Sequence, residues 1–146
     1  MKTKQIILLA ILIVVAIAAW YGYKQYTRKN TDLAYAKADV EITTTNLIKS
    51  FETNEKLSNE KYLDKIIELS GNIKEINKDE KGYYTLVLGE AGNMSSVRCS
   101  MDSAHQHDVL SVKQGDQVSV KGACTGFNAD ALLGSDVILN RCVLKK

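Results

Sequence analysis

Two stretches of alternating apolar and polar residues are each interrupted by a glycine, and this feature constrains the fold most. The first stretch covers residues 66–73 and contains Gly71, and the second covers residues 118–124 and contains Gly122. Alternation is typical of a strand with one buried face, and a glycine in place of a packed side chain marks a bulge or a sharp bend. Strands bent in this way close a sheet on itself, so the sequence predicts a small closed barrel.

The charge of the chain is unevenly distributed. Of 146 residues, 45% are hydrophobic and 25% are charged, which is ordinary for one globular domain with an appendage. Residues 1–29 contain five basic residues and no acidic one, so residues 30–146 contain 14 Lys and Arg against 17 Asp and Glu, a net charge of −3. A surface that follows a phosphate backbone needs clustered cations, so this balance disfavours general nucleic-acid binding by the folded part.

An uncharged run of 18 residues, from Ile6 to Tyr23, lies near the N-terminus. As a helix it would measure roughly 27 Å, close to the hydrocarbon thickness of a bilayer. We expect residues 1–29 to form a single-pass membrane anchor, residues 30–43 a stalk or linker, and residues 44–146 the folded domain with a helical N-terminal extension. The run is flanked by Lys2, Lys4, Lys24, Arg28 and Lys29, and it ends in aromatic residues typical of the lipid headgroup level, namely Trp20, Tyr21, Tyr23 and Tyr26.

A cleaved signal peptide is the alternative to this anchor. The segment Ala16-Ile17-Ala18 fits a small-x-small cleavage site, but the apolar run continues past it into the aromatic residues. No cysteine follows the run, which leaves lipid anchoring without an acceptor. The positive charges on the two sides are balanced, so they do not fix the orientation, and we favour a location at the cell membrane with the domain outside the cytoplasm.

Five stretches predict strands, over residues 65–76, 83–89, 95–101, 116–127 and 136–144. A helix is predicted over residues 104–113, between the third and fourth strands. Ser103 and Gln106 stand at capping-box spacing there, and Gly115 suits the position after the helix. Three strands, a helix and two strands is the order of a five-stranded Greek-key OB barrel, so the predicted fold class is mainly β.

Two short helices are predicted ahead of the barrel. Thr43 or Thr44 would cap the first, which carries Leu47 and Phe51 on one face, and the second carries Tyr62. Apolar residues at helical spacing usually belong to the core. We therefore expect Leu47, Phe51 and Tyr62 to cover one open end of the barrel.

Several motifs between residues 44 and 144 together carry a family resemblance. They are Leu47-x-x-x-Phe51, Asn54-Glu55, Tyr62, Leu69-x-Gly71-x-Ile73, Val97-x-Cys99-x-Met101, Gly115-Asp116-x-Val118-x-Val120-x-Gly122-x-Cys124-x-Gly126 and Val137-x-Leu139-x-x-Cys142. This combination resembles the tRNA-anti-like family of OB-fold domains. The resemblance implies tethering to a membrane by an N-terminal segment or a lipid. It implies nucleic-acid binding only through the likeness to anticodon-binding OB domains, and fold alone does not confer function.

The three cysteines, Cys99, Cys124 and Cys142, all fall on predicted core faces of strands. In an OB barrel the last strand neighbours both the third and the fourth, so Cys142 could meet either Cys99 or Cys124. For a domain outside the cytoplasm we predict one disulfide bond that involves Cys142. The alternative is three buried thiols in a reducing compartment. No close cysteine pair exists, so we expect no zinc site.

Catalytic signals are absent from the sequence. His105 and His107 invite a metal site, but residues two apart on a helix point in divergent directions, which makes a solvated helix face the better interpretation. The sequence also contains no nucleophile elbow, no plausible Cys-His arrangement and no glycine-rich phosphate loop. We therefore expect no enzyme activity, no cofactor and no metal.

The ligand face of an OB fold lies on its second and third strands with the loops beside them. Here that face would present Tyr83, Thr85 and Arg98, together with Val87, Ser96 and Ser100. Phe127 and the two leucines that follow it, Leu132 and Leu133, form an apolar cluster in the loop before the last strand. Such a cluster either folds over the barrel mouth or contacts a partner.

The sequence thus predicts a membrane-anchored, non-catalytic OB-fold binding module for a protein or another oligomeric ligand. The alternative is a single-stranded nucleic-acid-binding protein that uses Tyr83, Arg98 and the nearby Lys78 and Lys81. One aromatic residue and one cation on the face make a thin platform for stacked bases, because single-strand binders usually carry several aromatics in a basic groove. A purely structural tethered domain is the third possibility.

Overall fold

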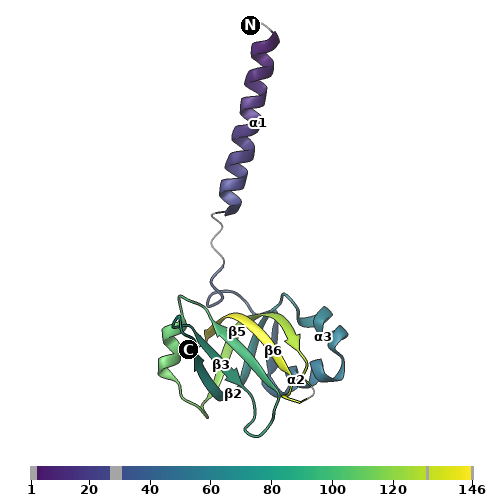
Figure 1. Cartoon of the computed structure of the whole chain (residues 1–146), viewed down its shortest axis with the longest axis vertical. Helices are drawn as coiled ribbons and strands as arrows, with labels where there is room; N and C mark the ends of the chain where they lie inside the picture. Colours follow the sequence, from purple (N-terminus) through teal and green to yellow (C-terminus); the bar gives the residue numbers. More distant parts are fainter. Residues whose placement is uncertain (1–2, 27–30, 131, 146) are drawn as a thin grey trace. The chain divides into compact units, whose positions relative to one another are not determined.

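The structure, a computed structural model, describes residues 3–26, 31–130 and 132–145, and it divides into two compact units that meet between Thr31 and Asp32. The first unit contains helix α1 (Thr3–Tyr26), whose segment Gln5–Tyr26 is long and apolar enough to cross a membrane. Ile6 and Tyr23, the expected ends of the span, both lie in α1 and are exposed (Figure 1). The flanking residues Lys2, Arg28 and Lys29 lie outside the described residues.

The second unit is built on a barrel of five strands, as the sequence predicts (Figure 1). The strands pair in the order β2-β3-β4-β6-β5, and a β2–β5 pairing closes the barrel. The β4–β6 pair is parallel and the other barrel pairs are antiparallel. The strands are β2 (Ile66–Lys78), β3 (Tyr84–Leu88), β4 (Ser96–Met101), β5 (Gln117–Asn128) and β6 (Asp136–Leu144).

A further strand, β1 (Val40–Thr43), pairs in parallel with β2. This differs from the expectation that residues 30–43 form a stalk or linker. From Asp32 onward the segment belongs to the barrel unit, because Leu33 is buried in that unit and β1 bonds to the part of β2 that β3 does not cover. The sheet therefore has six strands, one of them outside the closed barrel.

Helices α2 (Thr44–Thr53) and α3 (Glu55–Tyr62) follow β1 directly (Figure 1). Thr43 caps α2, since its hydroxyl oxygen accepts a hydrogen bond from the backbone N–H of Asn46, the third residue of the helix. Leu47, Phe51 and Tyr62 are buried in the barrel core, as the helical spacing predicts. The two helices thus place a hydrophobic layer against the barrel.

The helix predicted over residues 104–113 is instead a short 3₁₀ helix, η1 (Gln106–Ser111). Only Val109 of η1 is buried, so a longer helix would have no apolar stripe to pack. The segment also begins in a turn, because the Asp102 carboxylate accepts the Ala104 N–H, and the Ser103 side chain caps no helix. Local hydrogen bonding of this kind competes with an α-helix.

The two glycines that interrupt the alternating stretches make room for particular side chains. A Cβ atom at Gly71 in β2 would overlap the Thr44 hydroxyl at the start of α2. A Cβ atom at Gly122 in β5 would lie 2.5 Å from the sulfur of Cys142 in β6. Both positions therefore require glycine because neighbouring elements approach closely, in addition to any bending of the strands.

Candidate ligand-binding face

The outer face of β3, β4 and β6 carries a row of side chains in register. Val87 pairs with Arg98 across β3 and β4, and Arg98 pairs with Ile138 across β4 and β6. The residues between them, such as Leu86 and Cys99, are fully buried in the core, so the alternation puts the row on the other side of the sheet. This is the face that the sequence assigns to a ligand.

A groove of about 380 Å³ lies between this face and the loop that joins β5 to β6. Its apolar lining consists of Val87, Met94, Leu133 and Ile138, and its polar lining includes Lys74, Glu75, Ser96, Arg98, Asn128, Asp130 and Asp136. Volumes of this size are typical of small binding sites. The groove combines an apolar lining with charges of both signs.

Arg98 and Asp136 form an ion pair in the groove. The Arg98 Nε atom lies 2.6 Å from Asp136 Oδ2, and the Ser96 hydroxyl donates a hydrogen bond to the other carboxylate oxygen at 2.5 Å. Half of the Arg98 side chain is exposed, so the pair contributes little to the stability of the fold. The carboxylate of Asp136 compensates the positive charge of Arg98.

The loop between β5 and β6 exposes apolar side chains at the edge of the groove. The Asp130 carboxylate accepts hydrogen bonds from the backbone N–H groups of Leu132 and Leu133, which lowers the pKa of Asp130 and fixes the turn. Leu132 and Leu133 are 81% and 76% exposed, and Met94 on the β3–β4 connection is 62% exposed. The loop reaches Met94 closely enough that a Cβ atom at Gly134 would overlap its backbone.

The predicted site residues are only partly brought together. Thr85 lies on the same outer face as Arg98, paired with Ser100, and Tyr83 lies at the end of the β2–β3 turn with 48% of its surface exposed. Phe127 lies elsewhere, because its ring stacks on Phe51 of α2 at a centroid distance of 5.0 Å. Phe127 therefore packs against the core, and the loop residues after it reach the groove.

Sequence analysis missed Asp136, Asp130 and Met94 as groove residues. Asp136 could have been predicted, because the third and last strands of an OB fold are neighbours. Asp136 begins β6 opposite Ser96 in β4. Asp130 and Met94 had no such signal, because both lie in connections whose paths depend on tertiary packing.

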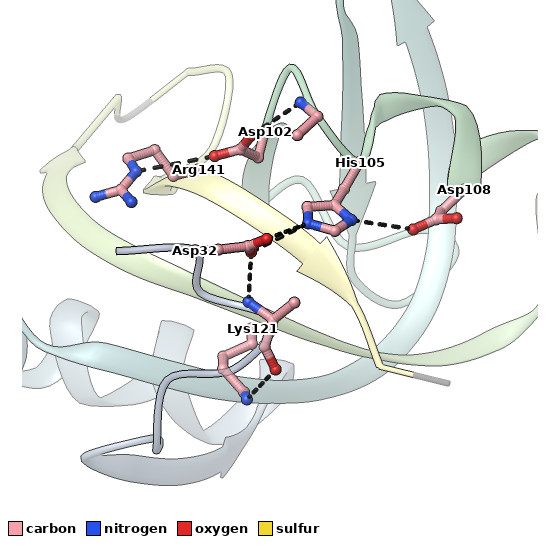
Figure 2. Close-up of polar contacts among 8 residues, drawn as sticks. Asp32, Asp102, His105, Asp108, Lys121 and Arg141 are labelled. Atoms are coloured by element: carbon pink, nitrogen blue, oxygen red, sulfur yellow. Dashed lines mark hydrogen bonds and ion pairs between the residues drawn. The ribbon is translucent and has the colours of Figure 1, made fainter. Parts of the chain in front are cut away.

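A second polar cluster joins the segment before β1 to the barrel (Figure 2). His105 Nε2 lies 3.0 and 2.9 Å from the two carboxylate oxygens of Asp32, and His105 Nδ1 lies 3.6 Å from Asp108. Arg141 Nε lies 3.9 Å from Asp102 at the edge of the same cluster. Lys121 donates to the backbone carbonyl of Ala36 at 2.7 Å. The contacts of His105 and Lys121 hold residues 32–36 against β5 and the turn before η1.

The electrostatics of this cluster follow from the Asp32–His105 contact. The hydrogen bond that His105 donates to the Asp32 carboxylate raises the pKa of His105, and nearby Asp108 and Asp102 act in the same direction. The same hydrogen bond lowers the pKa of Asp32. In the part of the chain that the structure describes, no group of three or more His, Cys, Asp or Glu side chains is placed to hold a metal ion. The carboxylates around His105 therefore act as hydrogen-bond and charge partners of the imidazole.

A five-stranded barrel with this strand order and helices over its core is an OB-fold domain. The chain belongs to the tRNA_anti-like family, whose profile matches residues 1–143. The family resemblance in the sequence is thereby confirmed.

A solved structure with a similar fold comes from Klebsiella pneumoniae. A lipoprotein from Klebsiella pneumoniae to which nucleic-acid binding has been ascribed aligns with a TM-score of 0.59 and 17% identity, over 81% of this chain and 100% of that chain. A protein from Leishmania major assigned as an aspartyl-tRNA synthetase aligns with a TM-score of 0.45 and 10% identity, over 75% of this chain and 21% of that chain. No curated protein shows significant similarity to the sequence.

Proposed function

We propose that the protein is a membrane-anchored, non-catalytic OB-fold module that binds a polypeptide segment in the groove between the β3–β4 face and the β5–β6 loop. The observation that carries this proposal is the exposure of Met94, Leu132 and Leu133 at the edge of a groove that contains an internal ion pair. Exposed apolar side chains grouped beside a polar groove are typical of protein-interaction sites. A polypeptide can satisfy both the apolar residues and the polar groups.

The charges of the groove support a polypeptide over a nucleic acid. Arg98 is compensated by Asp136, and the Lys74 ammonium donates to the backbone carbonyl of Asn93 at 2.5 Å. The carboxylates of Glu75 and Asp130 also line the groove. A phosphate backbone would meet several carboxylates here and no cluster of unpaired cations, which is the reverse of what counterion release requires.

The anchored location is supported by α1 and by the lipoprotein with the same fold. The segment Gln5–Tyr26 meets the length requirement for a span, and its C-terminal aromatic residues are typical of a membrane interface. The domain is on the extracytoplasmic side, and α1 is the single span.

Site-specific photo-crosslinking in intact cells tests the proposal. A photoreactive phenylalanine replaces Leu133 in the full chain, and a matched variant carries it at Leu57, which is 61% exposed on α3. We expect an ultraviolet-dependent adduct from position 133 that protease degrades and nuclease does not, and no such adduct from position 57. An adduct at 133 that nuclease removes, or equal adducts at both positions, would contradict polypeptide binding in the groove.

Single-stranded nucleic acid is the second candidate, and the exposure of Tyr83 favours it. Tyr83 is positioned beside Lys81 at the β2–β3 turn, and Lys78 lies over the ring of Tyr84, so one aromatic and several cations occur at this end of the face. If this alternative holds, the full chain binds single-stranded oligonucleotides with an affinity that falls steeply with salt, and the Tyr83→Ala, Arg98→Ala double variant loses that binding. Salt-insensitive or absent binding would leave the polypeptide proposal in place.

A further inference from the structure

Two of the three cysteines meet inside the barrel. Cys99 belongs to β4 and Cys142 to β6, which are neighbouring parallel strands, and both residues are fully buried. Burial and a side-chain interaction with Cys99 raise the pKa of the Cys142 thiol, so the two side chains are neighbours in the core. Both are free thiols in the structure, and they lie diagonally across the seam, since Cys99 pairs with Leu139 and Cys142 with Met101.

This meeting depends on an irregularity in β6. Leu139 and Cys142 are three positions apart, so strict alternation would put their side chains on opposite faces of the strand. Both are nevertheless fully buried, because the register with β4 shifts between them and Arg141 adopts a left-handed conformation with φ +56°. A bulge with an arginine at positive φ is strained, and here it returns Cys142 to the inside of the barrel.

The neighbouring strand also accommodates the sulfur of Cys142. A Cβ atom at Gly122 in β5 would lie 2.5 Å from Cys142 Sγ, so the absence of a side chain at position 122 leaves the space that the sulfur occupies. The bulge in β6 and the glycine in β5 are separate features of the sequence. The bulge returns the Cys142 side chain to the core that contains Cys99, and Gly122 leaves room for its sulfur.

Cys124, the other candidate partner, is placed differently. It is paired with Leu139 in the β5–β6 register, and its described polar surroundings are the backbone of Gly126 and the carboxylate of Asp64. Burial raises the pKa of the Cys124 thiol to about 11.

We propose that Cys99 and Cys142 are joined by a disulfide bond in the mature protein and that Cys124 remains a thiol. Both thiols give up a proton and an electron, and one S–S bond forms between them. The two electrons and two protons reduce the S–S bond of a disulfide donor, a thiol–disulfide oxidoreductase or a small disulfide, to two thiols. Exchange takes place before the barrel closes, because both thiols are buried afterwards. This inference rests on the extracytoplasmic location in the proposed function.

Trypsin separates the three cysteines, which makes the pairing directly measurable. Cleavage after Arg98, Lys113, Lys121, Arg141 and Lys145 puts Cys99 in peptide 99–113, Cys124 in peptide 122–141 and Cys142 in peptide 142–145. The full chain is extracted from membranes with free thiols blocked by an alkylating reagent, digested without reduction and analysed by mass spectrometry. We expect peptide 99–113 linked to peptide 142–145, and peptide 122–141 alkylated.

A refolding arm separates the failure of this inference from the failure of the proposed location. The full chain is unfolded in denaturant and detergent, and it is then refolded with a mixture of oxidised and reduced glutathione. The 99–142 link is expected in the refolded protein and in a Cys124→Ser variant. A Cys124–Cys142 link, or three free thiols after refolding to the native state, would overturn the inference. If the refolded protein contains the 99–142 link and the cellular protein contains only free thiols, the disulfide in the mature protein is overturned. The pairing itself then stands, and the proposed extracytoplasmic location is the part that failed.

Discussion

His105 Nε2 lies 2.9 Å from Asp32 Oδ2, and this contact ties the first residue of the barrel unit to the turn before η1 (Figure 2). Leu33, the next residue, is buried, so the polar contact lies beside a hydrophobic one. Together they explain why the chain from residue 32 belongs to the folded unit. The contact also makes the attachment of this segment sensitive to pH.

We expect the attachment to be strongest in mildly acidic solution. His105 has a raised pKa in the folded state, so its contribution is complete below its ordinary value of 6.5 and is lost as the pH rises through the folded pKa. Asp32 has a lowered pKa, so its contribution is complete above 3.8 and is lost as the pH falls through the folded pKa. The protection of residues 32–36 against hydrogen exchange, expressed relative to the intrinsic base-catalysed rate at each pH, should therefore be greatest between these limits and fall several-fold toward pH 9.

The Asp32→Asn substitution tests the cause of this pH dependence. It removes the charged partner, so the pKa of His105, followed by its imidazole proton resonances in NMR, should fall relative to the unsubstituted protein. Asp39→Asn is a suitable control because Asp39 accepts a backbone hydrogen bond from Ile66, away from the imidazole. An unchanged His105 titration in Asp32→Asn would contradict the assigned cause.

Replacing Gly122 by alanine should destabilise the barrel. The added methyl group would lie 2.5 Å from Cys142 Sγ and 3.2 Å from the Cβ of Leu139, and overpacking of this kind costs about 1–3 kcal/mol. Gly126→Ala is the matched control in the same strand, because its Cβ would meet no atom within 4 Å. Denaturant unfolding of both variants measures the difference, and equal stabilities would refute the close approach of β5 and β6.

Phe51→Ala should cost about 3–5 kcal/mol of unfolding free energy. Phe51 is 1% exposed and lies between the rings of Phe127 and Tyr62, so its removal leaves a cavity between α2 and the barrel. Leu57→Ala, on the exposed side of α3, should change stability by less than about 0.5 kcal/mol. Thermal or chemical denaturation of the two variants checks this contrast.

Asp136→Asn should make the groove more attractive to polyanions. The substitution leaves the guanidinium of Arg98 without its charged partner while keeping an oxygen for the Ser96 hydroxyl. We expect weak, salt-dependent oligonucleotide binding to increase relative to the unsubstituted protein, and binding of a polypeptide ligand to decrease. Fluorescence titration at two salt concentrations measures the first effect. A decrease in oligonucleotide binding would mean that Asp136 assists nucleic-acid recognition instead.

Reduction of the proposed disulfide should lower stability by about 4 kcal/mol, the value expected for a loop of the length between Cys99 and Cys142. Denaturant unfolding with and without a phosphine reductant measures this difference. The Cys99→Ser variant should show no effect of the reductant. An equal effect of the reductant on that variant would contradict the 99–142 pairing.

Periodicity predicts most of the barrel because the core faces of its strands alternate regularly. Leu69, Val97 and Val120 are all fully buried where the alternation puts them. β1 was not predicted, since a four-residue strand after a polar segment has too few alternating positions to stand out. The segment before β5 is predicted as a longer helix and is a 3₁₀ helix, because the spacing of capping residues does not report how many residues of the segment are buried. Only Val109 of η1 is buried.

The candidate site is harder to predict because its contacts join segments far apart in the sequence. Thr85 and Arg98 follow from strand alternation. For Phe127 the sequence left two possibilities, folding over the barrel mouth or contact with a partner, and in the structure its ring stacks on Phe51. The proximity of Cys142 to Cys99 depends on a bulge at Arg141 that strict alternation hides. The sequence left both pairings of Cys142 open for that reason.

Binding outside the cytoplasm and the proposed disulfide both require α1 to hold the barrel on the extracytoplasmic side of the membrane. The most direct measurement places a cysteine at Leu132, which is 81% exposed, and treats intact cells and lysed cells with a membrane-impermeant thiol reagent. The native cysteines are fully buried and serve as an internal control in the unsubstituted chain. We predict labelling of the variant in intact cells and no labelling of the unsubstituted chain. Labelling of the variant only after lysis would put the barrel in the cytoplasm and contradict the proposed location.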